Sequence, residues 1–172
     1  MSTEIGDDVR EAFSSRQLRD ALGCFATGIT VVTAHPEGYQ PIGLTVNSFA
    51  SVSLDPPLVL WSLDRNSENV TPFLQSDHFG VNILEAGQAD ISGRFATRGR
   101  HNMAPDEFET WKTGAPILVE TLAQFDCKVF KKFEGGDHMI FLGEVVQIAS
   151  GQGNPLLYAA GDYRQLAPSQ GE

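Results

Sequence analysis

Short apolar segments rich in β-branched residues recur along most of the chain, and Gly, Pro and Asp residues separate many of them. Segments of this length and composition predict β-strands rather than long helices. The sequences at 36–39 and 134–137 contain the Gly and Pro residues of tight turns and predict hairpins. The strands that we expect cover residues 29–35, 41–49, 57–63, 78–84, 117–135, 138–150 and 155–160.

A short helix is expected near the start of the chain. Ser14 or Ser15 can cap it, because a serine side chain accepts a hydrogen bond from the first free backbone N–H groups, and Gly23 or Gly28 limits it. Its larger apolar residues fall on one face: Leu18, Ala21, Leu22 and Phe25.

Two more helices are expected between the strands. One begins at Asn66 or Ser67 and continues through Phe73 and Leu74. Either Pro72 lies in its first turn or the helix is short, since proline breaks a helix interior. The other covers residues 86–99 and ends in a loop. Residues 99–116 form a long irregular segment, and long loops in compact domains are often functional. Its isolated apolar anchors are Met103, Phe108 and Trp111.

Six or seven strands joined by short connections, with two or three short helices, do not follow the βαβ alternation of a parallel sheet. They predict a mainly β domain, an antiparallel Greek-key barrel with helices at its rim. With 172 residues the chain is about one domain. We expect an N-terminal arm over 1–12, one domain over 13–167 and a tail over 168–172.

The net charge of −10 argues against nucleic acid and anionic membranes as partners. No apolar run approaches 18 residues and the N-terminus is polar and acidic, so we expect a cytoplasmic protein without a membrane span or signal peptide. Cys24 and Cys127 lie far apart, outside any CxxC or Cys/His cluster. We expect two free buried thiols and no metal site, with a disulfide left open.

The segment from Gly43 to Leu63 carries the clearest candidate chemistry. Its first half has hydroxyl and amide side chains separated by small or apolar residues, and its second half is a nearly continuous apolar run after two prolines. Small side chains let a backbone approach a flat polar ligand or a phosphate closely. The alternative is an ordinary strand connection whose hydroxyls satisfy their own backbone.

Common catalytic motifs are missing from the sequence. It has no Gly-x-Ser-x-Gly elbow, no Walker loop, no His-Glu-x-x-His and no Gly-x-Gly-x-x-Gly after a strand. An enzyme whose hard chemistry is done by a cofactor would lack a conspicuous catalytic side chain, because its residues only bind and orient.

The chain resembles the flavin reductase-like family, small NAD(P)H:flavin oxidoreductases with an FMN-binding split β-barrel. The family pattern Gly-x-Thr-x-x-Ser-Phe/Ala-x-Ser-x-Ser-x-x-Pro-Pro-Leu is matched from Gly43 to Leu58. Four more segments resemble family motifs in the same order, and the resemblance covers roughly residues 12 to 166: TGITVVTA at 27–34, DRNSENVTPF at 64–73, GDHMIFLGEVV at 136–146 and PLLYAAGDYRQL at 155–166.

The resemblance implies which residues meet the flavin. The isoalloxazine edge and ribityl chain would be held by Thr45, Val46, Asn47, Ser48, Ser51 and Ser53. A phosphate would lie at a helix start formed by Arg65, Asn66 and Ser67. The alternative is that these residues form an ordinary N-cap and that the arginine side chain is solvated. Further flavin contacts are implied for Arg94, Phe95, Ala96, Tyr163 and Arg164.

These further positions also have structural interpretations. Three arginines within 94–100 suggest an anion site in so acidic a chain, or else a solvated face. Tyr163 and Arg164 could instead dock a C-terminal strand.

In the family pattern Gly-Asp-His, His138 matches a residue near the nicotinamide, where it would bind the carboxamide or help to deliver a proton. A lone histidine is more often structural.

The function implied is hydride transfer from NADH or NADPH to FMN or FAD, with reduced flavin passing to a separate monooxygenase. The alternatives are a protein that holds FMN tightly and reduces another acceptor, a flavin- or haem-binding barrel without NAD(P)H activity, and a bare interaction module. A homodimer with flavin near the subunit interface is also implied. Such a dimer would give large aromatic residues a place to be buried: Trp61, Phe73, Phe108 or Trp111.

Overall fold

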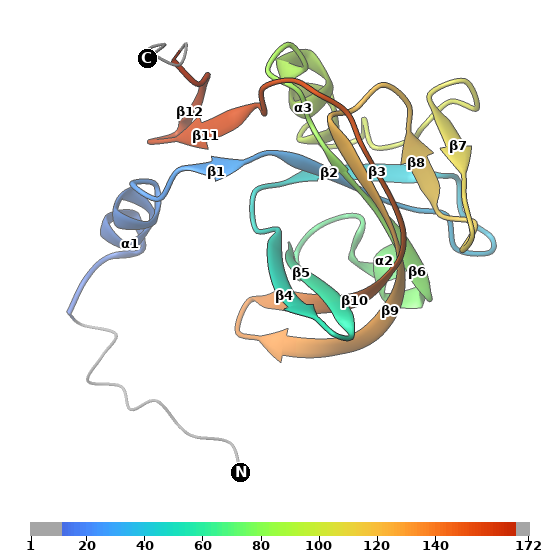
Figure 1. The fold of residues 1–172 in the computed structure, drawn as a ribbon. Helices are drawn as coiled ribbons and strands as arrows, with labels where there is room; N and C mark the ends of the chain where they lie inside the picture. Colours follow the sequence, from blue (N-terminus) through green and yellow to red (C-terminus); the bar gives the residue numbers. More distant parts are fainter. Residues whose placement is uncertain (1–11, 168–172) are drawn as a thin grey trace.

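The computed structural model describes residues 12–167, and its main body is a strongly curled antiparallel sheet (Figure 1). Seven strands follow the order β3-β2-β6-β9-β10-β5-β4. Strands that are distant in sequence are neighbours in the sheet, since β6 lies beside β2 and β10 lies beside β5. This arrangement is typical of a Greek-key barrel. The predicted mainly β barrel is therefore confirmed. The strands are β2 (Thr30–Ala34), β3 (Ile42–Val46), β4 (Ala50–Leu54), β5 (Pro57–Asp64), β6 (His78–Ile83), β9 (Ala123–Gly135) and β10 (His138–Ser150).

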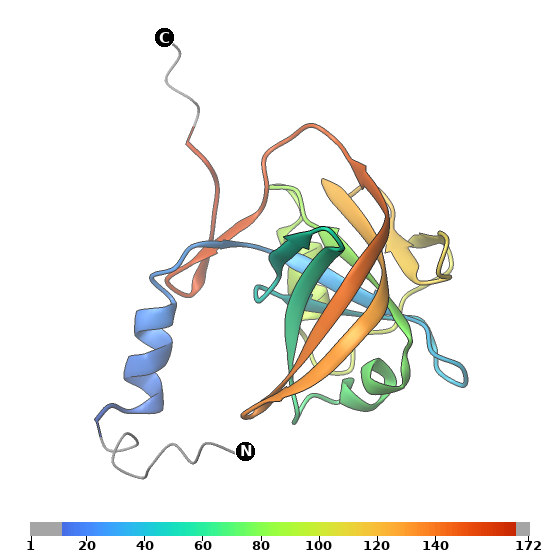
Figure 2. The ribbon, with the colours of Figure 1, turned by 60° about the horizontal axis from the view of Figure 1, so that its bottom comes forward.

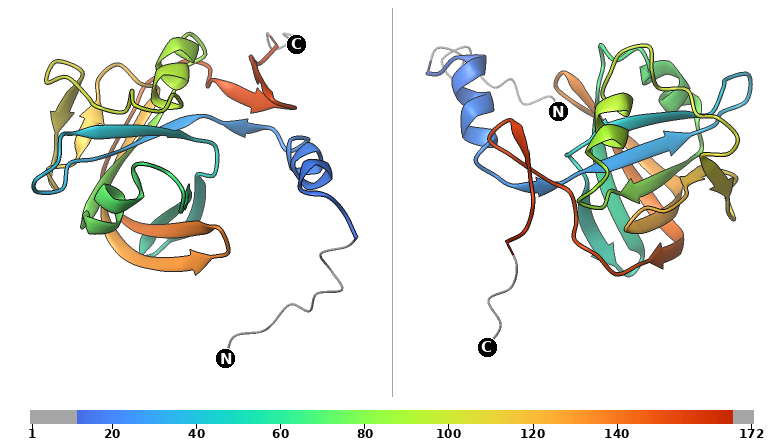
Figure 3. Two further views of the ribbon diagram at one scale, coloured as in Figure 1. Left: turned by 180° about the vertical axis from the view of Figure 1, so that it is seen from behind. Right: turned by 90° about the horizontal axis from the view of Figure 1, so that it is seen from above.

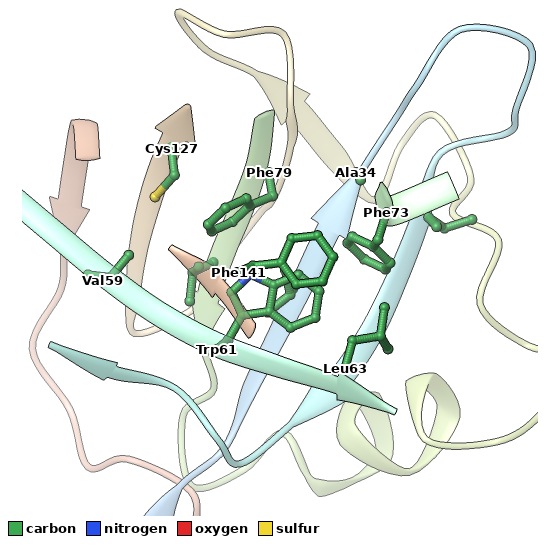
Figure 4. Close-up of a cluster of buried hydrophobic side chains, with 11 residues drawn as sticks. Ala34, Val59, Trp61, Leu63, Phe73, Phe79, Cys127 and Phe141 are labelled. Carbon is green, nitrogen blue, oxygen red and sulfur yellow. The ribbon is translucent and has the colours of Figure 1, made fainter. Parts of the chain in front are cut away.

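The inside of the barrel is filled by aromatic side chains (Figure 4). Trp61 on β5 stacks on Phe141 of β10 with ring centroids 4.5 Å apart, and Phe73 meets it edge-on at 5.0 Å. Both Trp61 and Phe73 are buried within the single chain. These two residues therefore do not need the burial place that a dimer was expected to offer them.

Smaller elements surround the barrel. A three-stranded sheet of β1 (Thr27–Gly28), β11 (Leu157–Ala159) and β12 (Asp162–Arg164) lies beside it, next to α1 (Ser15–Leu22) (Figure 2). The remaining elements are α2 (Val70–Gln75), α3 (Ala89–Phe95), β7 (Phe108–Thr110) and β8 (Pro116–Leu118).

A second apolar cluster lies under α3, between this helix and β2. Phe95 at the end of α3 packs over Gly43 of β3, where a Cβ atom would lie only 2.8 Å from the Phe95 ring. A glycine is needed at residue 43 because any side chain there would push α3 away from the sheet. The short Gly-x-Thr sequence thus sets how closely α3 approaches β3.

Several predicted boundaries are wrong. The segment 41–49 is not one strand, because β3 ends at Val46 and the chain turns before the separate edge strand β4. The segment 117–135 breaks at a turn containing Glu120, whose φ of 58° is incompatible with a strand. The strand β12 was not among the expected strands, although a C-terminal strand was the structural alternative for Tyr163 and Arg164, and the irregular segment 99–116 contains β7.

The helices also differ from expectation. Ser14 caps α1 through a capping box with Gln17, as predicted, but none of its residues is buried in this chain. Helix α2 begins at Val70, with Asn69 at the N-cap position, so Asn66 and Ser67 do not cap it.

Both cysteines are free, as expected, but only Cys127 is buried, whereas Cys24 is exposed. Burial raises the pKa of the Cys127 thiol. Within residues 12–167, no helix combines the length and apolarity required to cross a membrane. Most of the expected 1–12 arm and the whole 168–172 tail lie outside the described residues.

Candidate functional site

A cleft lies where β3 ends and the chain turns toward β4. Thr45, Val46 and Asn47 form a floor shared by two cavities of about 240 and 260 Å³. The turn is held in place by Ser48, whose hydroxyl accepts a hydrogen bond from the N–H of Ser62 at 2.9 Å and faces the Ser62 carbonyl at 3.2 Å. Ser48 therefore ties the end of β3 to β5 across the seam of the barrel.

The first cavity is lined by residues of β3, α3 and the small sheet. Thr45 donates a hydrogen bond to the carbonyl oxygen of Ser92 at 2.7 Å, and the hydroxyl of Tyr163 donates to the side chain of Ser92 at 2.8 Å. Ser92 is fully buried, so it joins three separate elements at the cavity wall. We did not predict Ser92, although it lies in the same Ser-Gly-Arg-Phe-Ala sequence as three predicted residues.

The second cavity opens toward His138, the first residue of β10. The Nδ1 atom of His138 lies 2.7 Å from the carboxylate of Asp137, and this hydrogen bond lowers the pKa of Asp137. A carboxylate only accepts, so Nδ1 carries a proton and Nε2 is available to a ligand. The side chain of His138 is 42% exposed, which leaves it accessible from the cleft.

Two further cavities extend the cleft. A groove of about 800 Å³ shares Asn47, His138 and Tyr158 with the cavities above and reaches α1. A smaller cavity of about 200 Å³ shares Ser67 and Ala96 with them and is also lined by Asn66. The shared residues make one elongated cleft from α1 to the loop before α2.

Nine predicted site residues line this cleft, and the other six do not. Those at the cleft are Thr45, Val46, Asn47, Ser48, Asn66, Ser67, Ala96, His138 and Tyr163. Ser51 and Ser53 lie on the edge strand β4, and Phe95 is buried beneath α3. Arg65 pairs with Glu134 at 2.7 Å, and Arg164 pairs with Asp162.

Arg94 belongs to a network next to the cleft. It makes a two-pronged contact with the carboxylate of Glu107, and its Nη2 atom donates to the carbonyl oxygen of Asn102 at 2.7 Å. The hydrogen bond from Arg94 lowers the pKa of Glu107. Arg94 also lines a broad groove over α3 that shares Tyr163 with the cleft. The guanidinium thus has protein partners, and its contact with flavin stays a prediction.

The cleft suits binding and orientation more than acid, base or nucleophilic catalysis. Its floor offers an exposed amide at Asn47, its walls offer the hydroxyl of Tyr163 and the imidazole of His138, and its remaining lining is largely apolar or small. Within residues 12–167 no group of three or more His, Cys, Asp or Glu could hold a metal ion. A flat ring with polar edges fits this donor set.

Comparison with known proteins agrees with the geometry of the cleft. The FMN reductase (NADH) SmoA of Agrobacterium fabrum is 47% identical over 158 residues, which cover 90% of this chain and 87% of that protein. An NADH-dependent FAD reductase of Streptomyces globisporus is 39% identical over 165 residues, with 91% and 88% of the two chains covered.

Solved structures are similar over the same range. The Streptomyces globisporus NADH:FAD oxidoreductase SgcE6, in complex with NAD and FAD fragments, superposes with a TM-score of 0.84 at 36% identity, with 91% of this chain and 94% of that chain covered. The flavin reductase PheA2 superposes with a TM-score of 0.81 at 37% identity, and the match covers 91% of this chain and 100% of that chain. The model of the flavin reductase like domain matches residues 22–167, and this chain belongs to that family.

Proposed function

We propose that this protein transfers hydride from NADH to FMN or FAD in the cleft at the end of β3. The observation that carries the proposal is the elongated cleft floored by Thr45, Val46 and Asn47, in a chain of the flavin reductase family. When both are bound, the nicotinamide donates hydride to the flavin ring, and the protein supplies binding, orientation and shielding from water.

The floor of the cleft holds the flavin ring. The backbone of the β3–β4 turn and the amide of Asn47 meet its polar edge, while Tyr163 and Tyr158 close one side. Ser48, Thr45 and Ser92 act mainly by fixing the turn and α3, because their hydroxyl or carbonyl groups bond to one another and to the barrel. Ser51 and Ser53, on the adjoining edge strand, remain proposed flavin contacts.

The flavin phosphate lies toward Asn66 and Ser67, at the narrow end of the cleft. Arg98 lines the same cavity and can supply a positive charge there. Arg65 and Arg94 remain proposed phosphate contacts, although each also has a carboxylate partner in the protein.

The nicotinamide lies on the side of His138. The Asp137 carboxylate keeps a proton on Nδ1, so Nε2 is free to bond with the carboxamide. The wide groove toward α1 begins at this residue and has room for the rest of the dinucleotide. NADH is the proposed donor because it is the donor named for the two similar reductases described above.

Reduced flavin is proposed to leave the cleft and serve a separate oxygenase. Similar proteins include the reductase component of the flavin-dependent trigonelline monooxygenase of Acinetobacter baylyi and the reductase subunit HsaB of Rhodococcus jostii. Free thiols at Cys24 and Cys127 suit a reducing compartment, so we place this activity in the cytoplasm. A homodimer is proposed because α1 leaves large apolar side chains exposed.

The test is oxidation of NADH or NADPH by the purified protein, followed at the nicotinamide absorbance band with FMN, FAD, riboflavin or no flavin. We expect flavin-dependent oxidation that is faster with NADH than with NADPH. A yellow protein that oxidises neither nucleotide would contradict the reductase proposal and favour a flavin-binding protein with another acceptor or none.

A further inference from the structure

One carboxylate joins the two walls of the cleft at its narrow end. Glu68, in the loop before α2, accepts hydrogen bonds from the backbone N–H of Gly99 and from Nε of Arg98 at 3.2 Å, and its Oε1 atom lies 3.1 Å from Nε2 of His101. The three partners of Glu68 lie in the loop after α3. We call these four residues, Glu68, Arg98, Gly99 and His101, the Glu68 clasp.

His101 anchors the clasp to the floor of the cleft. Its side chain is only 8% exposed, and its Nδ1 atom lies 3.2 Å from the carbonyl oxygen of Gly43 on β3. The N–H of Gly43 in turn donates to the carbonyl oxygen of His101 at 2.8 Å. The loop after α3 is thereby docked along the edge of β3, which is the strand that supplies Thr45, Val46 and Asn47.

The two partners of the His101 ring are both acceptors. Gly43 presents a carbonyl oxygen, and Glu68 presents a carboxylate whose pKa is lowered chiefly by the hydrogen bond from Gly99. A neutral imidazole has one N–H, whereas an imidazolium has two. Each ring nitrogen therefore faces an acceptor, an arrangement that suits an imidazolium, with a proton on each nitrogen, better than a neutral ring.

The charged groups around the His101 ring bear on the same protonated state. Glu68 faces it from the loop before α2, and Arg98 lies on its own loop. The neighbouring Arg94 is already paired with Glu107 and reaches the carbonyl oxygen of Asn102. When His101 is protonated, the carboxylate of Glu68 and the cations of Arg98 and His101 give the clasp a net charge of +1. When the His101 ring is neutral, the net charge of the clasp is zero.

The clasp also fixes the position of Arg98. Its side chain is 88% exposed, its Nε atom is held by Glu68, and its two Nη groups make no hydrogen bond within residues 12–167. Glu68, Arg98 and His101 line the same cavity as Asn66 and Ser67. The Glu68–His101 contact therefore affects two features of this cavity. One is the distance between the loop before α2 and the loop after α3, and the other is the orientation of the Arg98 guanidinium.

We propose that Glu68 and His101 are positioning residues for the phosphate end of the flavin, and that the clasp operates only while His101 is protonated. This inference rests on the proposed binding of flavin in the cleft. In a protein with a net charge of −10, an anionic group needs a local excess of positive charge. Flavin affinity should therefore fall as pH rises and the His101 ring loses its proton.

The experiment measures FAD binding by isothermal titration calorimetry from about pH 5.5 to 8.5, the range in which histidines ordinarily titrate. FAD is the probe because the phosphate of FMN itself ionises near pH ~6. We expect the Kd of the wild type to rise about fivefold or more across this range, as expected for loss of one charge-assisted hydrogen bond.

Two variants separate the clasp from other titrating groups. His101→Gln should bind FAD about fivefold more weakly at low pH and show no pH dependence, because its amide keeps only part of the contact. Glu68→Gln should also be insensitive to pH, since a glutamine can satisfy a neutral His101. His35→Gln is the matched control, because His35 is exposed and lies outside the cleft, and it should behave as the wild type.

A second measurement does not depend on flavin. Nitrogen-15 spectra of the four histidines should show both ring nitrogens of His101 protonated in the wild type at low pH, with loss of that proton coupled to the change in Kd. An unchanged pH profile in His101→Gln would overturn the proposal and point to His138. Tight FAD binding that does not vary with pH in the wild type would overturn the clasp but leave the proposed function intact, whereas no binding at any pH would overturn both.

Discussion

The hydroxyl groups of Thr45 and Ser48 are bonded to backbone groups of other elements rather than directed only at the cleft. The floor between them presents the exposed side chain of Asn47 and the backbone of the turn. Individual side chains at this site therefore shape the cleft more than they react. Replacements should change binding constants more than the rate of hydride transfer.

His138 is the residue whose replacement should affect one substrate selectively. We expect His138→Ala to raise the KM for NADH about tenfold, as loss of one hydrogen bond in a cleft would do, with a much smaller change in the KM for flavin. Steady-state kinetics with each substrate varied in turn would measure this, with His35→Ala as the control at an exposed site. A collapse of flavin affinity instead would place His138 against the other ligand.

The Arg94–Glu107 pair should contribute a stability that depends on pH. Because Arg94 lowers the pKa of Glu107 in the folded protein, the contribution is present above the ordinary pKa of a glutamate and is lost as pH falls through the lowered value. We expect Glu107→Gln to lower the free energy of unfolding by about 1 kcal/mol at neutral pH and by much less at a pH well below the ordinary pKa of a glutamate. Urea unfolding at both pH values would measure the difference.

Arg94→Ala completes that comparison. If Arg94 acts only through Glu107, both variants should lose similar stability and keep the flavin KM of the wild type. A rise in flavin KM in Arg94→Ala but not in Glu107→Gln would support direct contact between this arginine and the flavin.

At the scale of elements, the sequence predicts those parts whose side chains alternate or form apolar runs. β5 was predicted because residues 57–63 form a nearly continuous apolar run, and the β9–β10 hairpin because two glycines occupy a tight turn, where Gly136 has a positive φ. In the structure the buried residues of β5, such as Val59 and Trp61, recur at period two. β4 was missed as a separate strand because it is an edge strand without a buried residue, which leaves no hydrophobic signal.

The site was predictable only where it is local in sequence. The turn at 45–48 carries a recognisable motif, whereas Ser92 and the Glu68–His101 contact depend on pairings between distant segments. A buried histidine with two acceptor partners has no signature along the chain, because its partners, Gly43 and Glu68, come from other elements. Such contacts follow from the fold and not from local spacing.

Gly80 on β6 lies where β6 packs closely against β8. A Cβ atom there would lie 2.5 Å from the backbone oxygen of Pro116 and from Oγ1 of Thr33, so the backbone would have to move. We expect Gly80→Ala to destabilise the protein by about 2–4 kcal/mol, as overpacking of a buried site does. Thermal unfolding would show this against Gly87→Ala, where a Cβ meets open space.

At the scale of the whole molecule, α1 projects from the barrel beside the small sheet (Figures 2 and 3). No residue of this helix is buried in the single chain, and Leu22 and Phe25 are 63% and 79% exposed. The groove toward α1 is also part of the cleft, since it shares Asn47 and His138 with the cavities over β3. A second copy that covered this helix would bury apolar surface and complete one wall of the cleft.

The double variant Leu22→Asp/Phe25→Asp should therefore separate the subunits and impair the enzyme together. Light scattering should give the mass of two chains for the wild type and of one chain for the variant, with a raised KM for NADH because the groove next to His138 loses its outer wall. Val119→Asp is the matched control, because Val119 is 43% exposed and follows β8, which lies across the barrel from α1 (Figure 1). A wild type that stays monomeric as its concentration rises would contradict the dimer, and a dimeric double variant would show that α1 is not its interface.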